Sequence, residues 1–168
     1  MSRQAAITTS DFVARYGGIY EHSPWVAEDV ASEAVACEEP EQIAALMADC
    51  VDNASPERQL ALIRAHPDLA GKAQLAGELT QDSSTEQSKA GLDQCSSEEY
   101  AQFQVLNDAY HQKFGFPFVM AVRASTRAEI LAAFAARLEN DAATEFETAL
   151  QEIHQIAKLR LQAMEAGE

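Results

Sequence analysis

Residues 96–115 read SSEEYAQFQVLNDAYHQKFG, and this stretch decides the fold class. Ser96 and Glu99 have the spacing of a capping box, in which each side chain bonds the other residue's backbone N–H at the start of a helix. Apolar side chains then recur at helical spacing, at Phe103, Leu106, Tyr110 and Phe114. Gly115 is the residue type that often follows a last helical turn. The stretch therefore predicts a long helix that ends at Gly115.

Similar signals on both sides of this helix predict further helices. Helix starts are indicated at Ser10, at Ser23 with Pro24, at Pro40, at Ser55 with Pro56, at Ser83 or Ser84, and at Thr126 with Glu129. Pro67 disfavours helical backbone at the residue before it, so the helix that starts at Ser55 ends there. Residues 66–81 read as a loop with one short helix, and a last long helix covers about 142–166.

Together these signals predict an all-α protein. We expect one compact domain over residues 1–168, a bundle of about seven to eight helices. Only 7 Gly and 5 Pro interrupt a chain that is 47% hydrophobic, a composition typical of a globular protein.

The charge balance excludes two classes of partner. Lys and Arg number 12 against 27 Asp and Glu, which gives a formal net charge of −15. Nucleic acids and anionic membranes repel such a chain, so we expect neither as a partner. An anionic substrate would have to be held by a local cation or by backbone donors.

Cysteine usage and the chain ends indicate a cytoplasmic protein. Cys37, Cys50 and Cys95 are odd in number and lack motif spacing, which argues against a disulfide framework and against a structural zinc site. Residues 1–10 lack the apolar core of a signal peptide, and no apolar run approaches the thickness of a bilayer. Residues 165–168 do not form a peroxisomal targeting signal.

His66 is the first candidate for chemistry. It lies directly before Pro67, at a helix end and on a loop, where catalytic groups are often found. Its side chain could act as a general acid or base near neutral pH. The alternative is that His66 stabilises the helix C-terminus through the helix dipole.

The stretch SSTEQ at 83–87 also allows two interpretations. Ser83 with Glu86, and Ser84 with Gln87, have capping-box spacing, so Glu86 could merely close the start of a helix. A helix N-terminus with free backbone N–H groups and hydroxyls is also a ready site for an anion.

Arg160 falls on the apolar stripe of the last helix. The stripe of Phe146, Leu150, Ile153 and Ala157 continues onto Arg160. A buried cation needs a partner, which could be a glutamate of the protein or an anionic ligand.

The segment at 116–122, FPFVMAV, differs from its helical surroundings. It is apolar, β-branched and interrupted by Pro117, so we expect it to be extended and buried. Its backbone polar groups need partners, which loops and helix ends or a flat polar ligand could supply.

These same stretches resemble the OHCU decarboxylase family, where OHCU is 2-oxo-4-hydroxy-4-carboxy-5-ureidoimidazoline. The resemblance is carried by HPDLAGK at 66–72, SSTEQ at 83–87 with AGL at 90–92, FGFPFV at 114–119, and residues 152–161. It implies an all-α fold, no metal or organic cofactor, and a homodimer. The implied reaction is the last step of urate breakdown, which yields (S)-allantoin from a small ureide substrate.

The resemblance also implies roles for particular residues. His66 would be the catalytic proton-transfer residue, with Glu86 as its catalytic partner. The implied substrate contacts are Pro67, Ser83, Ser84, Thr85, Glu86, Gln87, Phe118, Val119, Met120, Ala121, Val122 and Arg160. Two other readings of the chain are a helical module that binds a purine-derived ureide without turning it over, and a helical protein-interaction domain with an acidic recognition face.

Overall fold

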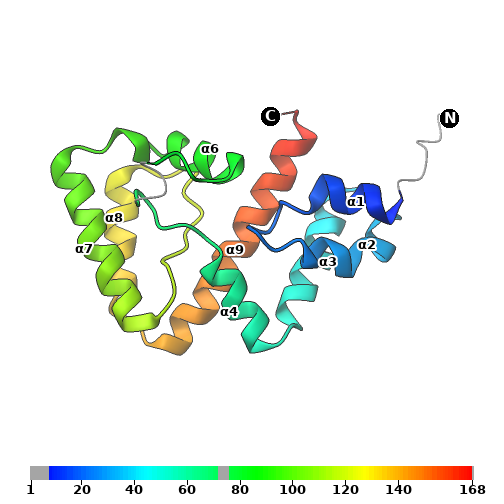
Figure 1. The fold of residues 1–168 in the computed structure, drawn as a ribbon, viewed down its shortest axis with the longest axis horizontal. Helices are drawn as coiled ribbons and strands as arrows, with labels where there is room; N and C mark the ends of the chain where they lie inside the picture. The colour runs from blue at the N-terminus through cyan, green and yellow to red at the C-terminus, as the bar shows by residue number, and fades with distance from the viewer. Residues whose placement is uncertain (1–7, 72–75, 168) are drawn as a thin grey trace. The chain divides into compact units, whose positions relative to one another are not determined.

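The computed structural model describes residues 8–71 and 76–167 and confirms the all-α prediction. The described residues form eight α-helices and one short 3-10 helix, η1, with no strand (Figure 1). The elements are α1 (Thr9–Tyr16), α2 (Trp25–Ala34), α3 (Pro40–Asp52), α4 (Pro56–Arg64), α6 (Gln81–Lys89), η1 (Leu92–Gln94), α7 (Ser97–Phe114), α8 (Arg127–Arg137) and α9 (Ala142–Glu165). Part of the short helix expected within 66–81, and Lys72 of the HPDLAGK stretch, lie outside the described residues.

The chain divides into two compact units. One comprises residues 1–65 and 154–168, and the other comprises residues 66–153. The long helix α9 contributes its first part to the second unit and its last part to the first. A single domain over residues 1–168 therefore stays a prediction.

In the first unit, α2 packs against both α1 and α3. Its core holds large apolar side chains that are fully buried, among them Phe12, Met47, Val51 and Leu62. Each lies on the buried face of its own helix.

In the second unit the core is aromatic and centres on Tyr110 of α7. Its ring meets the rings of Phe118 and Phe134 edge-on, with centroids 5.5 and 5.8 Å apart. Phe118 stacks on Phe134 of α8 with centroids 3.9 Å apart. The segment 116–122 is not helical, and Phe116, Phe118, Val119 and Val122 are buried, so the predicted burial is confirmed.

Helix starts that depend on a local side chain were predicted well, but with exceptions. The capping boxes Ser96–Glu99 and Thr126–Glu129 are both formed, and Ser55 caps α4. The predicted cap at Ser10 is wrong, because Thr8 caps α1 and bonds the Asp11 backbone N–H. The predicted cap at Ser23 is also wrong, because its hydroxyl donates instead to the Glu21 carbonyl at 2.9 Å.

Among the described helices, none combines the length and the apolar character that crossing a bilayer requires.

Candidate active site

His66 lies immediately beyond the end of α4. The helix closes at its C-cap residue Ala65, whose N–H bonds the Ala61 carbonyl, and His66 follows in a bend before Pro67. The side chain of His66 is buried, with the residue 7% exposed. A titratable ring held away from bulk water on restricted backbone is suited to general acid–base chemistry, and this role stays a prediction.

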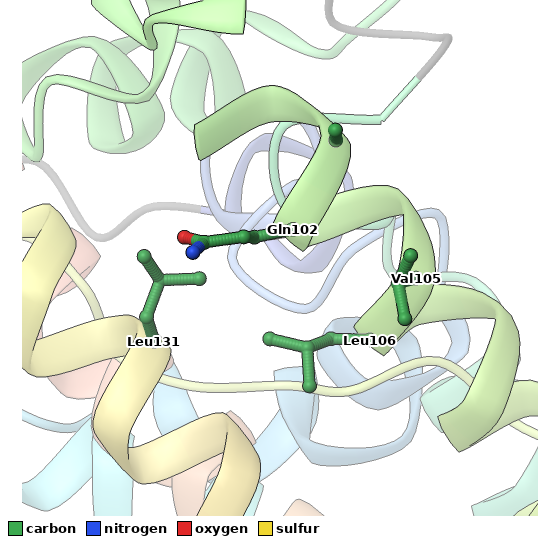
Figure 2. Close-up of a pocket in the computed structure, with 5 residues that line it drawn as sticks. Gln102, Val105, Leu106 and Leu131 are labelled. Atoms are coloured by element: carbon green, nitrogen blue, oxygen red, sulfur yellow. The ribbon is translucent and has the colours of Figure 1, made fainter. Parts of the chain in front are cut away.

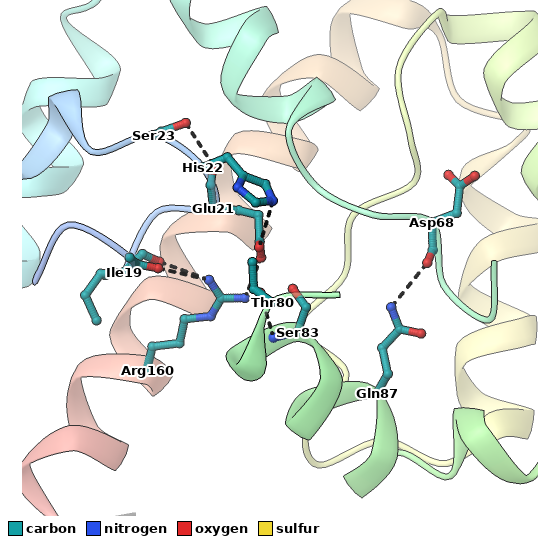
Figure 3. Close-up of polar contacts among 10 residues, drawn as sticks. Ile19, Glu21, His22, Ser23, Asp68, Thr80, Ser83, Gln87 and Arg160 are labelled. Carbon is teal, nitrogen blue, oxygen red and sulfur yellow. Dashed lines mark hydrogen bonds and ion pairs between the residues drawn. The ribbon is translucent and has the colours of Figure 1, made fainter. Parts of the chain in front are cut away.

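The loop that follows His66 is clamped by the side-chain amide of Gln87. Gln87 Nε2 donates to the Asp68 carbonyl at 3.2 Å (Figure 3). Its Oε1 accepts from the Ala70 N–H at 3.1 Å. Gln87 is only 3% exposed. Both ends of the amide are thus engaged with the backbone of the loop, which gives Gln87 a structural task besides the substrate contact expected for it.

Two side chains of α7 hold the same loop. Gln104 donates to the Ala70 carbonyl at 2.8 Å, and Asn107 donates to the Leu69 carbonyl at 3.0 Å. Ala70 has a positive φ of 50°, which is unfavourable for a residue with a Cβ. Hydrogen bonds to both its N–H and its C=O hold it there, so the loop after His66 is fixed from two helices.

The start of α6 corrects one interpretation of Glu86. We expected a start at Ser83 or Ser84, with Glu86 closing a capping box. The helix instead begins at Gln81, and Thr80 is the N-cap, whose hydroxyl accepts from the Ser83 N–H at 3.2 Å (Figure 3). Glu86 is therefore the sixth residue of the helix, too far along to bond the N-cap, and the capping explanation for it is wrong.

The five residues 83–87 differ in exposure. Ser83 and Gln87, one turn apart, are buried, while Thr85 and Glu86 are half-buried and Ser84 is exposed. One face of α6 thus points into the protein, and the half-buried Glu86 lies at the edge of that face. Ser84 lies on the opposite face.

The segment 118–122 finds part of its backbone partners inside the protein. Arg137 Nη1 donates to the Val119 carbonyl at 2.6 Å, and Glu152 accepts a hydrogen bond from the Ala121 backbone. Within the described residues, the backbone N–H groups of Phe118, Val119, Met120 and Val122 have no hydrogen-bond partner. The protein therefore bonds some of these backbone groups itself, and whether a ligand bonds the others stays a prediction.

Arg160 is buried and paired, as one of its two interpretations requires. Its Nη2 lies 2.9 Å from Glu21 Oε2, and its Nη1 donates to the Gly18 and Ile19 carbonyls at 3.4 and 3.3 Å (Figure 3). Arg160 is 4% exposed and Glu21 2%. The sequence gives no signal for Glu21, which lies 139 residues away along the chain.

Three further polar residues were missed by reading the sequence. Arg137, Glu145 and Glu152 lie next to the segment 118–122 or bond residues that do. The sequence singled out none of the three as a candidate, although Glu152 lies in the 152–161 stretch that resembles the family, and Glu145 proves to be fully buried. Only the tertiary structure brings them to the segment.

An apolar groove between α7 and α8 contains none of the predicted site residues. It has a volume of about 480 Å³ and is lined by Ala101, Gln102, Val105, Leu106 and Leu131 (Figure 2). No titratable side chain lines it, so it has no acid–base chemistry to offer. Across the described ranges, no group of three or more His, Cys, Asp and Glu side chains is placed to hold a metal ion.

Comparison with known proteins gives a consistent result. The family model described as OHCU decarboxylase matches residues 5–162. The chain is 46% identical to the 2-oxo-4-hydroxy-4-carboxy-5-ureidoimidazoline decarboxylase of Haloferax volcanii, covering 89% of this chain and 86% of that protein. It is 42% identical to the protein of the same name from Halalkalicoccus jeotgali, covering 91% and 84%.

Solved structures agree with these relatives. A crystal structure of (S)-allantoin synthase superposes with a TM-score of 0.74 at 33% identity, over 94% of this chain and 50% of that chain. A structure of OHCU decarboxylase in the presence of (S)-allantoin superposes with a TM-score of 0.65 at 24% identity, over 83% and 92%, and shows a shared fold. Because the family model spans nearly all of the sequence and both of the relatives named above exceed 40% identity, this chain belongs to the OHCU decarboxylase family.

Proposed function

We propose that this protein decarboxylates 2-oxo-4-hydroxy-4-carboxy-5-ureidoimidazoline to (S)-allantoin in urate degradation. The observation that carries the proposal is the match to the family from residue 5 to residue 162, which includes His66, the 83–87 stretch, the 118–122 segment and Arg160. The protein is accordingly an enzyme, a carboxy-lyase.

The substrate carries its own electron sink. Its carboxylate lies on the carbon next to a ring C=N, so the electrons of the breaking C–C bond flow into that imine as carbon dioxide leaves. The imine nitrogen takes a proton as it receives these electrons, which gives a neutral enol. The enol then takes a second proton on the ureido-bearing carbon and loses its hydroxyl proton, which gives allantoin. Many decarboxylases use pyridoxal phosphate or thiamine for such a sink, and this substrate does not require one. We therefore propose a reaction without an added cofactor.

In this scheme His66 handles the proton of the 4-hydroxyl group. Its burial at a fixed loop supports this role, because a general base must be held within hydrogen-bond distance of the proton that it moves. We propose that Glu86 orients His66 and favours its protonated form. The start of α6 at Gln81 supports this, because Glu86 has no capping task there.

The binding contacts follow the remaining predicted residues. We propose that free backbone N–H groups between Phe118 and Val122 bind carbonyl oxygens of the substrate, much as an oxyanion hole does. Pro67 and residues Ser83, Ser84, Thr85 and Gln87 would complete the contacts. Ser84 is exposed, and the amide of Gln87 already bonds the backbone of the loop after His66. Substitution of these two residues is therefore the most informative test of the binding contacts.

Arg160 would contact a neutral oxygen of the substrate. The negative charge of Glu21, 2.9 Å away, offsets the charge of its guanidinium. A tight grip on the leaving carboxylate would also stabilise the ground state and slow the reaction. A carbonyl or ureido oxygen is therefore the better partner. We further propose a cytoplasmic homodimer, in keeping with the acidic chain and its three free cysteines.

The test is direct. Protonation of the planar enol without a chiral catalyst gives racemic allantoin, so circular dichroism of freshly generated substrate reports both the rate and the chirality of its conversion. Adding the purified protein should accelerate allantoin formation and give the (S) enantiomer alone. Racemic product formed at the spontaneous rate would overturn the proposed function, and exhaustive dialysis against a chelator should leave the rate unchanged.

A further inference from the structure

We propose that Arg137 and Glu145 are positioning residues that fix the orientation of the segment 118–122 toward the substrate. The proposal rests on the function proposed above, in which this segment supplies backbone donors. Neither residue is expected to touch the reacting atoms. Their task is to hold one peptide unit, and through it the direction of a free N–H group.

Arg137 grips the segment at two points. Its Nη1 donates to the Val119 carbonyl at 2.6 Å, and its guanidinium carbon lies 4.3 Å from the centroid of the Phe118 ring. The same ring stacks on Phe134, one turn earlier on α8, with an interplanar angle of 8°. A cation over an aromatic face and a stacked ring together fix the side chain of Phe118, while the hydrogen bond fixes the next carbonyl.

The planar peptide bond turns this grip into control of a donor. In a trans peptide, the C=O of one residue and the N–H of the next point in opposite directions, and the described chain has no cis peptide bond. Since the Val119 carbonyl points at Arg137, the Met120 N–H points away from Arg137. This N–H is one of those without a partner in the described residues, and Met120 is half-buried.

Glu152 acts on the following peptide in the same way. Its carboxylate accepts a hydrogen bond from the Ala121 backbone, so the Met120 carbonyl points away from Glu152. Within the described residues this carbonyl also has no hydrogen-bond partner. Both backbone polar groups of Met120 are thus left without a partner in the described residues. Its N–H can donate to a carbonyl of the substrate, and its C=O can accept from a ureido or ring N–H.

Glu145 holds Arg137 in place. Its Oε1 accepts from Arg137 Nε at 2.8 Å and from the Tyr110 hydroxyl at 2.7 Å, and its Oε2 accepts from Asn140 at 3.0 Å. Glu145 is fully buried, and the side chain of Arg137 is 12% exposed. Burial raises the pKa of Tyr110, so its phenol stays protonated and donates.

The arrangement is costly as a purely structural device. A buried ion pair adds little net stability compared with apolar side chains of the same size. In the described part of the chain, Arg137 Nη2 is buried without a hydrogen-bond partner, which is unfavourable. Local departures of this kind are expected where a residue serves function.

The experiment compares three variants of the full chain. Arg137→Lys keeps the positive charge but cannot bond Glu145 and Val119 together through a planar fork. Tyr110→Phe is the matched control, because it removes a hydrogen bond to the same Glu145 oxygen and leaves Arg137 and the aromatic cluster in place. The paired change Arg137→Gln with Glu145→Gln removes both charges at once, so neither is left buried and alone.

For each variant we would measure kcat and KM for freshly generated substrate, the Kd for (S)-allantoin, and the melting temperature. We expect Arg137→Lys and the paired variant to raise both KM and Kd roughly three- to tenfold, the worth of one lost hydrogen bond, with little change in kcat. Tyr110→Phe should lower the melting temperature and leave KM and Kd unchanged. Wild-type KM and Kd in both Arg137 variants would overturn the proposal, as would an equal rise in Tyr110→Phe.

Failure of the underlying function gives a different result. If the wild-type chain does not accelerate (S)-allantoin formation, the proposed function fails, whatever the variants do. If the wild type is active and both Arg137 variants keep its KM and Kd, only the inference about Arg137 and Glu145 fails.

Discussion

His66 has restricted backbone on both sides, because α4 ends at Arg64 and Pro67 follows directly. We expect His66→Asn, which keeps hydrogen bonding but removes titration near neutral pH, to lower kcat by roughly two to four orders of magnitude, the usual contribution of a general acid or base. The melting temperature and far-UV circular dichroism should stay close to those of the wild type. Near-normal turnover would remove His66 from the mechanism.

Glu86 offers a clean separation of charge from structure. Because Thr80 caps α6, Glu86→Gln disturbs no cap, and Gln has a similar helix propensity. We expect an unchanged melting temperature and a fall in turnover of about tenfold or more, on the order of one pKa unit of interaction. The limb of the pH–rate profile that reports His66 should move to lower pH, because the protonated ring loses the proposed anionic partner. An unchanged rate and profile would mean that His66 acts without Glu86.

At this scale the sequence identified candidates but not their partners. Arg160 stood out because it continues an apolar stripe, which needs only local spacing. Its partner Glu21 lies 139 residues away, and no pattern along the chain joins the two. Glu145 was missed for the same reason, since its three donors come from α7, α8 and the turn before α9.

On α6, the amide of Gln87 serves the loop that follows His66. Gln87→Met keeps the size of the side chain but removes the amide that bonds the Ala70 N–H and the Asp68 carbonyl. We expect the free energy of unfolding, measured in urea, to fall by about 1–3 kcal/mol, and kcat to fall as well. Ser88→Ala, which removes an exposed hydrogen bond to Asp93 from the same helix, should change stability by about 0.5 kcal/mol or less. A loss of substrate affinity with full stability would instead assign Gln87 to the substrate alone.

On α9, burial raises the pKa of the Glu152 carboxyl, while Arg137 and the Ala121 hydrogen bond offset part of this rise. A carboxyl whose pKa is raised on folding stabilises the protein below the usual carboxyl pKa, and this stabilisation is lost as pH rises through the folded pKa. Glu152→Gln keeps a hydrogen-bond acceptor and removes the titration. The melting temperature of Glu152→Gln minus that of the wild type should therefore be larger at pH 8 than at pH 4. A constant difference across this range would contradict the raised pKa.

Helix boundaries were predictable where one side chain dominates and uncertain where several compete. Ser96 and Thr126 each stand three residues before a glutamate, and both capping boxes form. Near α6, Ser83 and Ser84 each stand three residues before a Glu or Gln, which is the spacing of a capping box. The N-cap is nevertheless Thr80, and Ser83 is the third residue of the helix. The extra turn that this start adds brings no apolar residue to the helix, so hydrophobic periodicity could not reveal it.

The division into two units was only half visible in the sequence. One boundary, between Ala65 and His66, coincides with the helix end that Pro67 imposes. The other falls between Ile153 and His154, inside the continuous α9, where the apolar stripe runs on without a break. A helix shared by two cores has the same local pattern as a helix in one core, so only long-range packing separates them.

The net charge of −15 acts on the whole reaction, because the substrate carries a carboxylate and the product does not. At low ionic strength the field of the protein repels the substrate over about 30 Å, and at physiological salt over only about 8 Å. We therefore expect kcat/KM to rise severalfold between about 10 and 150 mM NaCl, mainly through a lower KM. The inhibition constant of neutral (S)-allantoin, measured in the same buffers, is the control and should stay constant. If kcat/KM falls with salt instead, cations near the substrate, Arg160 among them, dominate over the acidic surface, and the pairing of Arg160 with Glu21 does not neutralise it as proposed.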